Sequence, residues 1–301
     1  MGEVYTDPTR RHEFVLLFDV VNGNPNGDPD AGNLPRVDPE TMCGLVTDVC
    51  LKRKVRDYLQ LVHNVPIFIQ SRVALNTLIE QAGKEVDPQL KEKLERYDEL
   101  EDREKNELKN RPHDRVRDEL CRRYYDIRMF GAVLSTGRLN AGQVRGPVQL
   151  TFARSIDPIV PLDLSITRKA RTTEERMETG ETEIGRKPIV PYGLYRAHGF
   201  YNPFLARDTG VFEEDLELFW EALTRMFEFD RSAARGEMTV RGIWIFTHEN
   251  AKGNAPAHKL FALIKVRKKE GVESPRNFDD YEVIEPTEEQ IPSGIVLTRL
   301  V

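Results

Sequence analysis

The chain has 301 residues, of which 39% are hydrophobic and 31% charged, and its formal net charge is −6. This length can bury a substantial core, as one large domain or two ordinary ones. The net acidity counts against a uniformly basic nucleic-acid-binding protein, although a local basic strip is all that such binding requires. The charged fraction exceeds the usual quarter, which favours exposed helices or charged insertions.

The chain contains three cysteines, Cys43, Cys50 and Cys121, without a Cys-x-x-Cys spacing. This number and spacing predict neither a disulfide framework nor a zinc site, and they favour a reducing, cytoplasmic compartment. The first residues lack the basic and apolar regions of a signal peptide, and no apolar run is long enough to cross a membrane. We therefore expect a cytoplasmic protein with no membrane partner.

The first predicted elements are a strand, a long polar loop and a basic helix. Residues 14–21 are rich in β-branched and aromatic side chains, which is typical of a strand. Residues 22–33 contain Asn-Gly and Asp-Pro pairs, which form turns because Gly and Asn accept positive φ and Pro fixes φ. Residues 45–59 have a helical pattern with several Lys and Arg. A Gly- and Asn-rich loop before a basic helix suits a phosphate ligand, because it offers backbone N–H groups and cations.

Residues 76–125 shift sharply in composition and predict an inserted helical segment. Asp87-Pro88 is a typical helix start, because Asp caps the first turn and Pro fits the first helical position. Apolar residues then recur at helical spacing among charges of alternating sign, which is typical of a solvated helix. Pro112 interrupts this pattern, and a second helix is expected from Asp114 towards Tyr125.

Four further segments are predicted on either side of the insertion. Residues 67–70 have the composition of a short strand, and residues 126–134 should pack on the sheet. Residues 135–142 form another polar, Gly-rich loop, which carries Arg138. Residues 147–153 alternate apolar and polar side chains, as a half-buried strand does.

Residues 163–187 show no buried face of either period, and we expect a surface excursion built as a hairpin. Later core elements are expected as a strand at 189–201, a helix at 212–229, strands at 243–246 and 260–264, and a turn at 250–256. Helices separated by non-consecutive strands predict an α+β fold of the ferredoxin-like kind. We expect one domain over residues 1–301 with two insertions.

The enzyme alternative is a metal-dependent nuclease or RNA-processing enzyme that uses the Asn- and Asp-rich loop at residues 22–38. Asp28, Asp30 and Asp38 would supply oxygen ligands suited to Mg²⁺ or Ca²⁺, but the later Glu of an EF-hand is missing. The six histidines form no zinc-binding pair, and nothing in the sequence selects His198 or another histidine as a general base. We therefore expect no metal, no cofactor and no catalytic residue.

Five segments spread over most of the chain carry a family resemblance. They are residues 18–29 (Phe-Asp-Val-Val-Asn-Gly-Asn-Pro-Asn-Gly-Asp-Pro), 50–56 (Cys-Leu-Lys-Arg-Lys-Val-Arg), 126–134 with Phe130-Gly131, Val148-Gln149 and 192–196 (Tyr-Gly-Leu-Tyr-Arg). Residues 18–29 resemble the start of the backbone subunit of type I-C CRISPR Cascade complexes, the Csd-two branch of the Cas-seven family. The other segments resemble elements of the wider family in its own order: the basic helix (50–56), the second core helix (126–134), the strand after it (Val148-Gln149) and the strand that returns from the thumb hairpin (192–196).

The resemblance implies an α+β, RRM-like core of modified ferredoxin type. It implies a helical finger insertion at about residues 76–125 and a β-hairpin, called the thumb, at about residues 163–188. No aromatic RNP-type motif is evident on the sheet, so contact with phosphate is favoured over base stacking on the sheet face.

The implied function is non-catalytic binding of CRISPR RNA by copies that stack along the guide of a Cascade complex in antiviral defence. Each thumb would reach over the next copy, kink the RNA and flip out a base. The RNA segments between kinks would pair with target DNA. The implied partners are CRISPR RNA, the target DNA strand, further copies of the chain, and Cas-five-type, Cas-eight-type and small subunits.

The candidate RNA-binding side chains come from the two Gly-rich loops, the basic helix and the thumb. They are Asn22, Asn24, Asn26, Arg36, Lys52, Arg53, Arg56, Arg138, Arg168, Lys169, Arg171 and Met177. Met177 would act as an adaptable apolar wedge between bases, flanked by cations that hold phosphate. A third hypothesis, besides RNA binding and a metal-dependent enzyme, is an acidic scaffold protein that binds no nucleic acid.

Overall fold

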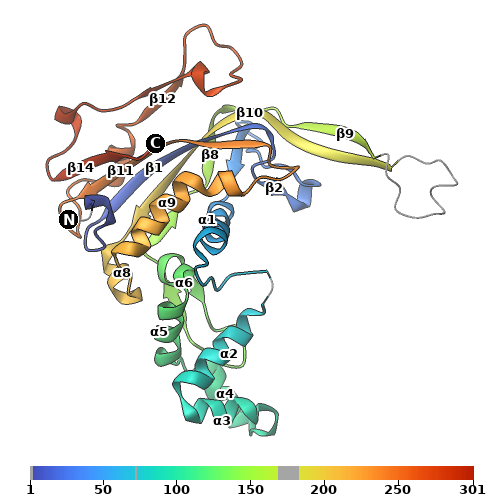
Figure 1. Ribbon diagram of the computed structural model, residues 1–301, viewed down its shortest axis with the longest axis vertical. Helices are drawn as coiled ribbons and strands as arrows, with labels where there is room; N and C mark the ends of the chain where they lie inside the picture. The colour runs from blue at the N-terminus through green and yellow to red at the C-terminus, as the bar shows by residue number, and fades with distance from the viewer. Residues whose placement is uncertain (1–2, 72, 169–182) are drawn as a thin grey trace.

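The computed structural model describes residues 3–71, 73–168 and 183–301. Its centre is a mainly antiparallel sheet in the order β14-β11-β1-β10-β8-β4, with β7 and β9 also paired to β10 (Figure 1). The strands are β1 (His12–Gly23), β4 (Cys43–Val46), β7 (Val148–Leu150), β8 (Ala153–Pro158), β9 (Leu162–Arg168), β10 (Glu183–Tyr201), β11 (Glu237–His248) and β14 (Ile295–Arg299). Short two-stranded pairs are β2 (Gly27–Asp28) with β3 (Leu34–Pro35), β5 (Gly131–Val133) with β6 (Gln143–Arg145), and β12 (Lys265–Lys268) with β13 (Tyr281–Ile284).

The α-helices within the described residues divide between the sheet and a separate helical segment. Those near the sheet are α1 (Asp48–His63), α6 (Tyr125–Phe130), α8 (Pro203–Thr209), α9 (Glu213–Phe229) and α10 (Ala257–Phe261). The helical segment contains α2 (Leu75–Val86), α3 (Pro88–Glu95), α4 (Asp102–Asn110) and α5 (Asp114–Arg123), and it lies below the sheet in Figure 1. None of these described helices is long and apolar enough to cross a membrane.

Both faces of β1 are buried, which explains its nearly continuous apolar run. On one face Phe14 and Phe18 pack against aromatic side chains of α9, and α1 joins the same apolar cluster. On the other face Val15 and Leu17 pack with Trp244 and with the α10 segment. The sheet is therefore the middle layer of the core, with α1 and α9 on one side and α10 with the β12–β13 pair on the other.

The connection from β10 through α9 to β11 gives the sheet its topology. β10 and β11 lie on opposite sides of β1 and both pair with it antiparallel, so they run parallel to each other. A helix that links two parallel strands with a third strand between them is the split β-α-β arrangement. The predicted strands at residues 14–21 and 189–201 and the predicted helix at 212–229 are confirmed.

Helices α2 to α5 surround an apolar cluster of their own. Ile79 and Ala82 of α2, Leu94 of α3 and Leu120 of α5 are almost inaccessible to solvent and belong to this second cluster. The Asp87 side chain accepts the backbone N–H of Gln89, as expected for the predicted helix start. The helix predicted from Asp114 is confirmed as α5, whereas the helix predicted between Asp87 and Pro112 is divided into α3 and α4 by a 3-10 turn at Tyr97–Glu99.

Four predicted segments differ from the structure. Residues 45 and 46 end β4, because Thr47 caps α1 and starts it at Asp48. Residues 67–70 form no strand. Residues 126–134 are helical only to Phe130, since Gly131 takes a positive φ of 80°. The strand predicted at 147–153 is divided between β7 and β8.

The last correction concerns residues 260–264, which were expected to form a strand. Leu260 and Phe261 belong to α10, and the strand follows as β12. Short apolar runs of this kind fit a buried helix or a buried strand equally well. Here the run covers the sheet face formed by Val15 and Leu17 and does not extend the sheet.

Candidate nucleic-acid interface

The polar loop after β1 is fastened directly to the start of α1. The side-chain Oδ1 of Asn26 accepts hydrogen bonds from the backbone N and from Oγ1 of Thr47, both at 3.0 Å. The Thr47 hydroxyl in turn accepts the backbone N–H of Cys50, which is a regular helix cap. The loop and the first turn of the helix are therefore joined by side-chain hydrogen bonds.

The other two candidate asparagines, Asn22 and Asn24, shape the loop rather than extend from it. Asn22 has a φ of 49°, a left-handed conformation that Asn tolerates. Asn24 is 5% exposed, and its Nδ2 donates to the carbonyl of Asn33 at 2.7 Å. Its backbone N donates to the carbonyl of Ala234 at 2.7 Å, which attaches the loop to the segment before β11.

The cations of α1 differ in their surroundings. Lys52 is mostly buried, with Nζ 3.0 Å from the carboxylate of Asp48 and 3.4 Å from Oε1 of Gln149 on β7. Arg53 is the most exposed of the cations predicted on this helix, with 45% of its side chain accessible, and its nearest carboxylate, that of Asp57, lies 3.7 Å away. Arg53 is therefore the α1 cation most available to a phosphate.

Arg56 occupies a structural position. Its Nε lies 2.8 Å from the carboxylate of Asp126, its side chain is 8% exposed, and its guanidinium lies over the Phe130 ring. Asp126 is fully buried and also accepts the backbone N–H groups of Phe68 and Ile69. These bonds explain why residues 67–70 form no strand. Arg56 was predicted to bind RNA, but these bonds hold its side chain in the core and away from a ligand.

Arg36 and Arg138 do not lie together. Arg36 follows β3, its backbone N–H donates to the carbonyl of Asn26, and its guanidinium lies 3.4 Å from Asp28. Arg138 belongs to the helical segment, where its guanidinium stacks over the Tyr97 ring at 4.7 Å. The loop that carries Arg138 is bonded to α2 and α4 and not to the loop after β1.

The excursion at residues 163–187 enters and leaves through paired strands. β9 and β10 form an antiparallel ladder from Leu162 opposite Ile189 to Arg168 opposite Glu183, and Figure 1 shows this ladder extending away from the sheet. Leu164 and Ile166 on β9 are 44% and 49% exposed. Arg168 ends β9, and the predicted RNA-binding residues Lys169, Arg171 and Met177 lie outside the described residues.

A cleft beside the loop was missed by the sequence reasoning. It has a volume of about 220 Å³ and lies between the loop after β1, the outer side of α1 and the segment that follows α9. Its third wall includes Asp230 and Arg235. The sequence of the third wall is a short stretch with Arg and Ala between a predicted helix and a predicted strand. Such a stretch is typical of an ordinary connecting loop and does not indicate a binding site.

A family model described as CRISPR-associated protein Cas7 matches residues 10–285 of the chain. The chain belongs to the Cas7 family. A curated protein of that description from Haloferax volcanii is 27% identical over 234 residues, which are 71% of this chain and 64% of the relative. The match therefore spans less than two thirds of the relative's length.

Similar solved structures also come from CRISPR complexes. A chain in a pre-nicking CRISPR RNA-guided surveillance complex has a TM-score of 0.49, 14% identity and 78% coverage of both chains. A chain of a type III-B Cmr-beta complex bound to cognate target RNA has a TM-score of 0.40 and 11% identity, covering 78% of this chain and 61% of the other. A second surveillance complex gives 0.41 and 12%, with coverages of 78% and 68%.

The histidine named in the enzyme alternative has a packing role in this Cas7 chain. His198 stacks on Phe261 at 4.1 Å, and its Nε2 accepts a hydrogen bond from Nε of Arg196. Burial and the neighbouring Arg196 lower the pKa of His198 to about 4. Arg196 also donates to the carbonyls of Phe261 and Ile264, so the pair fastens the α10 segment over the sheet.

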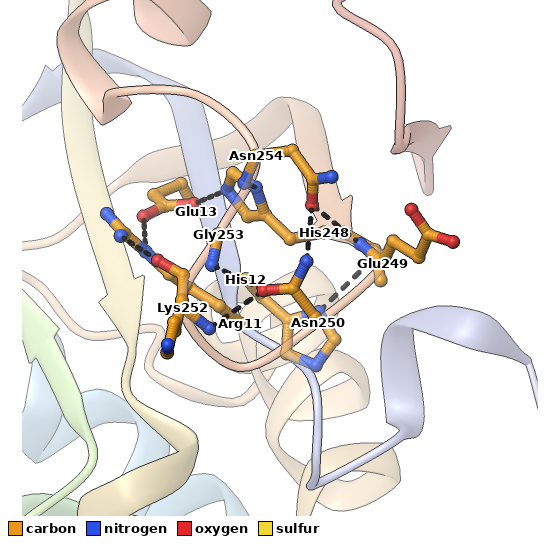
Figure 2. Close-up of polar contacts among 10 residues, drawn as sticks. Arg11, His12, Glu13, His248, Glu249, Asn250, Lys252, Gly253 and Asn254 are labelled. Carbon is orange, nitrogen blue, oxygen red and sulfur yellow. Dashed lines mark hydrogen bonds and ion pairs between the residues drawn. The ribbon is translucent and has the colours of Figure 1, made fainter.

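A second buried histidine, His248, closes the turn between β11 and α10 (Figure 2). Its Nδ1 accepts the backbone N–H of Asn254 at 2.7 Å, so the proton lies on Nε2, which donates to Glu13 at 2.5 Å. Glu13 is also bonded by Arg11, whose Nη1 reaches the carbonyl of Lys252. Within the described residues no group of three or more His, Cys, Asp or Glu side chains could hold a metal ion.

Proposed function

We propose that this Cas7-family chain binds CRISPR RNA along the surface formed by the loop after β1 and the outer side of α1. The observation that carries the proposal is the bond from Asn26 to Thr47, because it joins the loop to the helix that presents Arg53. Arg36 borders the same loop. Cations beside a turn-rich loop contact the phosphates, which every RNA sequence shares.

The contact is independent of base sequence. Lys52 is held between Asp48 and Gln149, so it supports the surface and its charge is partly neutralised. Arg53 and Arg36 are more exposed and can each hold a phosphate oxygen through a guanidinium fork. A small number of such contacts explains how a chain of net charge −6 can bind RNA, since one basic strip is enough.

The finer parts of the proposal follow the resemblance to type I-C backbone subunits. The β9–β10 ladder is the base of the thumb, which reaches over the next copy and kinks the RNA, with Met177 as the wedge. The exposed apolar side chains of Leu164 and Ile166 support this role, because a second protein surface would cover them. The split β-α-β arrangement supports the RRM-like core, with α2 to α5 as the finger insertion.

The complex would be a Cascade of type I-C in the cytoplasm. In it several copies stack on one guide beside Cas-five-type, Cas-eight-type and small subunits. The chain itself performs no catalysis, and the guide segments between kinks pair with the target DNA strand. Sequence reading is thereby left to base pairing, which agrees with a protein surface that meets phosphate.

The first experiment purifies the full chain after expression with a CRISPR array transcript. We expect RNA of uniform length to co-purify and to be protected from nuclease at regular intervals. A chain that purifies free of nucleic acid and binds no added RNA would favour the scaffold alternative. RNA cleavage that EDTA abolishes would favour the metal-dependent enzyme.

The second experiment measures affinity for single-stranded RNAs of different sequence over a range of salt concentrations. Arg53→Ala should weaken binding to every sequence by a similar factor and reduce the salt slope. Arg103→Ala on α4 is the matched control, because it removes one exposed cation far along the helical segment. Equal affinities for both variants and the unmodified chain would place the RNA surface elsewhere.

A further inference from the structure

The cleft beside the loop has three walls that come from distant parts of the chain. The loop after β1 supplies one wall, α1 supplies the second with Arg53 and Asp57, and the segment after α9 supplies the third with Asp230 and Arg235. A single water needs roughly 10–15 Å³ by the same kind of measure. The volume of about 220 Å³ therefore has room for a group much larger than water, such as a phosphodiester.

The third wall is held firmly against the loop. The backbone N–H of Asn24 donates to the carbonyl of Ala234 at 2.7 Å. A Cβ added to Gly23 would lie 3.0 Å from the backbone nitrogen of Gly236, so the two backbones approach as closely as glycine allows. The adjoining ends of β1 and β11 are paired, with Val21 opposite Glu237. Arg235 is thus placed relative to the loop by backbone contacts.

The charges that line the cleft leave cationic groups unsatisfied. Lys54 is buried against the carboxylate of Asp230, and Nε of Arg235 approaches the same carboxylate at 2.7 Å. One carboxylate therefore serves two cations. Within the described residues, the two terminal nitrogens of Arg235 make no hydrogen bond, and the side chain is 37% exposed.

Arg53 stands on the opposite wall of the same cleft. Its guanidinium makes no hydrogen bond within the described part of the chain, and its 3.7 Å approach to Asp57 is an exposed and weak ion pair. The lining thus contains three cations and two carboxylates. The cleft therefore has a net positive charge and is lined by two guanidinium groups. Their N–H groups can donate hydrogen bonds to the oxygens of a phosphate.

We propose that this cleft holds one internucleotide phosphate of the bound RNA between the guanidinium groups of Arg53 and Arg235. The inference rests on the proposed function and adds a binding residue from the segment before β11. Asp230 binds Nε of Arg235, which leaves the terminal nitrogens of Arg235 for the ligand. The RNA strand then passes between the loop after β1 and the segment between α9 and β11, and it does not contact α1 alone.

The test compares Arg235→Ala and Arg53→Ala in the full chain, with Arg103→Ala as the control for loss of one exposed cation. Each of the two cleft variants should weaken single-stranded RNA about tenfold and reduce the salt slope by about 0.7. Because both side chains would share one phosphate, the double variant should lose less than the product of the single losses. Arg235→Lys should recover only part of the loss, because Lys lacks the planar fork.

A chemical probe keeps the test independent of folding. Single methylphosphonate groups, which carry no charge, are placed one at a time along the RNA. One position should weaken binding to the unmodified chain and have a smaller effect on Arg235→Ala, because only Arg53 then contacts that phosphate.

Unchanged affinity of Arg235→Ala beside weakened Arg53→Ala would overturn this inference and leave the proposed function standing. Failure of the unmodified chain to bind any RNA would overturn the proposed function as well.

Discussion

The ion pair between Arg56 and Asp126 allows the most direct test of which α1 cations stabilise the fold and which are available to bind RNA. Asp126 is fully buried and accepts three hydrogen bonds, from Nε of Arg56 at 2.8 Å and from the backbone of Phe68 and Ile69 at 2.7 and 3.0 Å. Asp126→Ala would leave a buried guanidinium without its partner and two N–H groups without an acceptor. Removing one member of a buried pair costs about 3–5 kcal/mol.

The expected loss is a large share of the total stability. A domain has a free energy of unfolding of about 5–15 kcal/mol, so Asp126→Ala should lower the urea midpoint markedly or leave part of the chain unfolded. Arg56→Met keeps most of the packing on Phe130 and leaves Asp126 with its two backbone donors. We expect it to cost less, about 2 kcal/mol. The double variant should lose less than the sum by about 1–3 kcal/mol.

The matched control is Arg53→Met, three residues earlier on the same helix. Its side chain is 45% exposed, so the free energy of unfolding should change by less than about 0.5 kcal/mol while RNA affinity falls. The measurements are urea unfolding followed by circular dichroism, and RNA binding by the folded fraction of each variant. The reasoning is refuted if Arg56→Met unfolds like the unmodified chain yet loses RNA affinity as Arg53→Met does.

Three further predictions concern other parts of the chain. Burial lowers the pKa of His12 to about 4 from 6.5, so the unfolded state takes up its proton first as the pH falls. His12 should therefore contribute a fall in stability of up to about 3 kcal/mol between pH 6.5 and 4, and His12→Gln should reduce the slope in urea titrations, with the share of His198 remaining. Arg196→Ala removes the donors to the carbonyls of Phe261 and Ile264 and should cost about 2–3 kcal/mol with RNA affinity unchanged; a loss of affinity without a loss of stability would show that Arg196 meets the ligand. Replacing residues 167–186 by a short Gly/Ser turn should leave the core folded and abolish ordered assembly on RNA, and unchanged nuclease protection would reject the thumb assignment.

Much of the core could be predicted from the sequence, because its signal is local. β1 is a dense apolar run ended by turn residues, and α9 repeats apolar side chains at helical spacing over its length. The start of α3 at Asp87-Pro88 also depends on neighbouring residues alone. The run at residues 260–264 misled because a short apolar segment lacks the length that separates a helix from a strand.

The candidate site was harder to predict, because the state of a cation depends on distant partners. Arg56 is paired with a carboxylate 70 residues away, and Lys54 with one 176 residues away. Neither pairing can be recognised from the sequence of α1, where each Lys and Arg simply adds to the pattern of a basic helix. Arg235 was missed for the same reason, since its place in the cleft is set by the contact between Asn24 and Ala234, which lie far apart in the chain.

The buried cations of α1 have a consequence for the binding surface. Lys54 holds the helix to the segment after α9, and Arg56 holds it to α6 and to the chain at residues 68–69. These bonds fix the helix on which Arg53 stands before any RNA arrives. A surface that is already in place loses less conformational entropy on binding, so a few exposed guanidinium groups suffice. Under the proposed function the same helix uses its buried charges for position and its exposed Arg53 for the ligand, and these two roles cannot be told apart from the list of its basic residues alone.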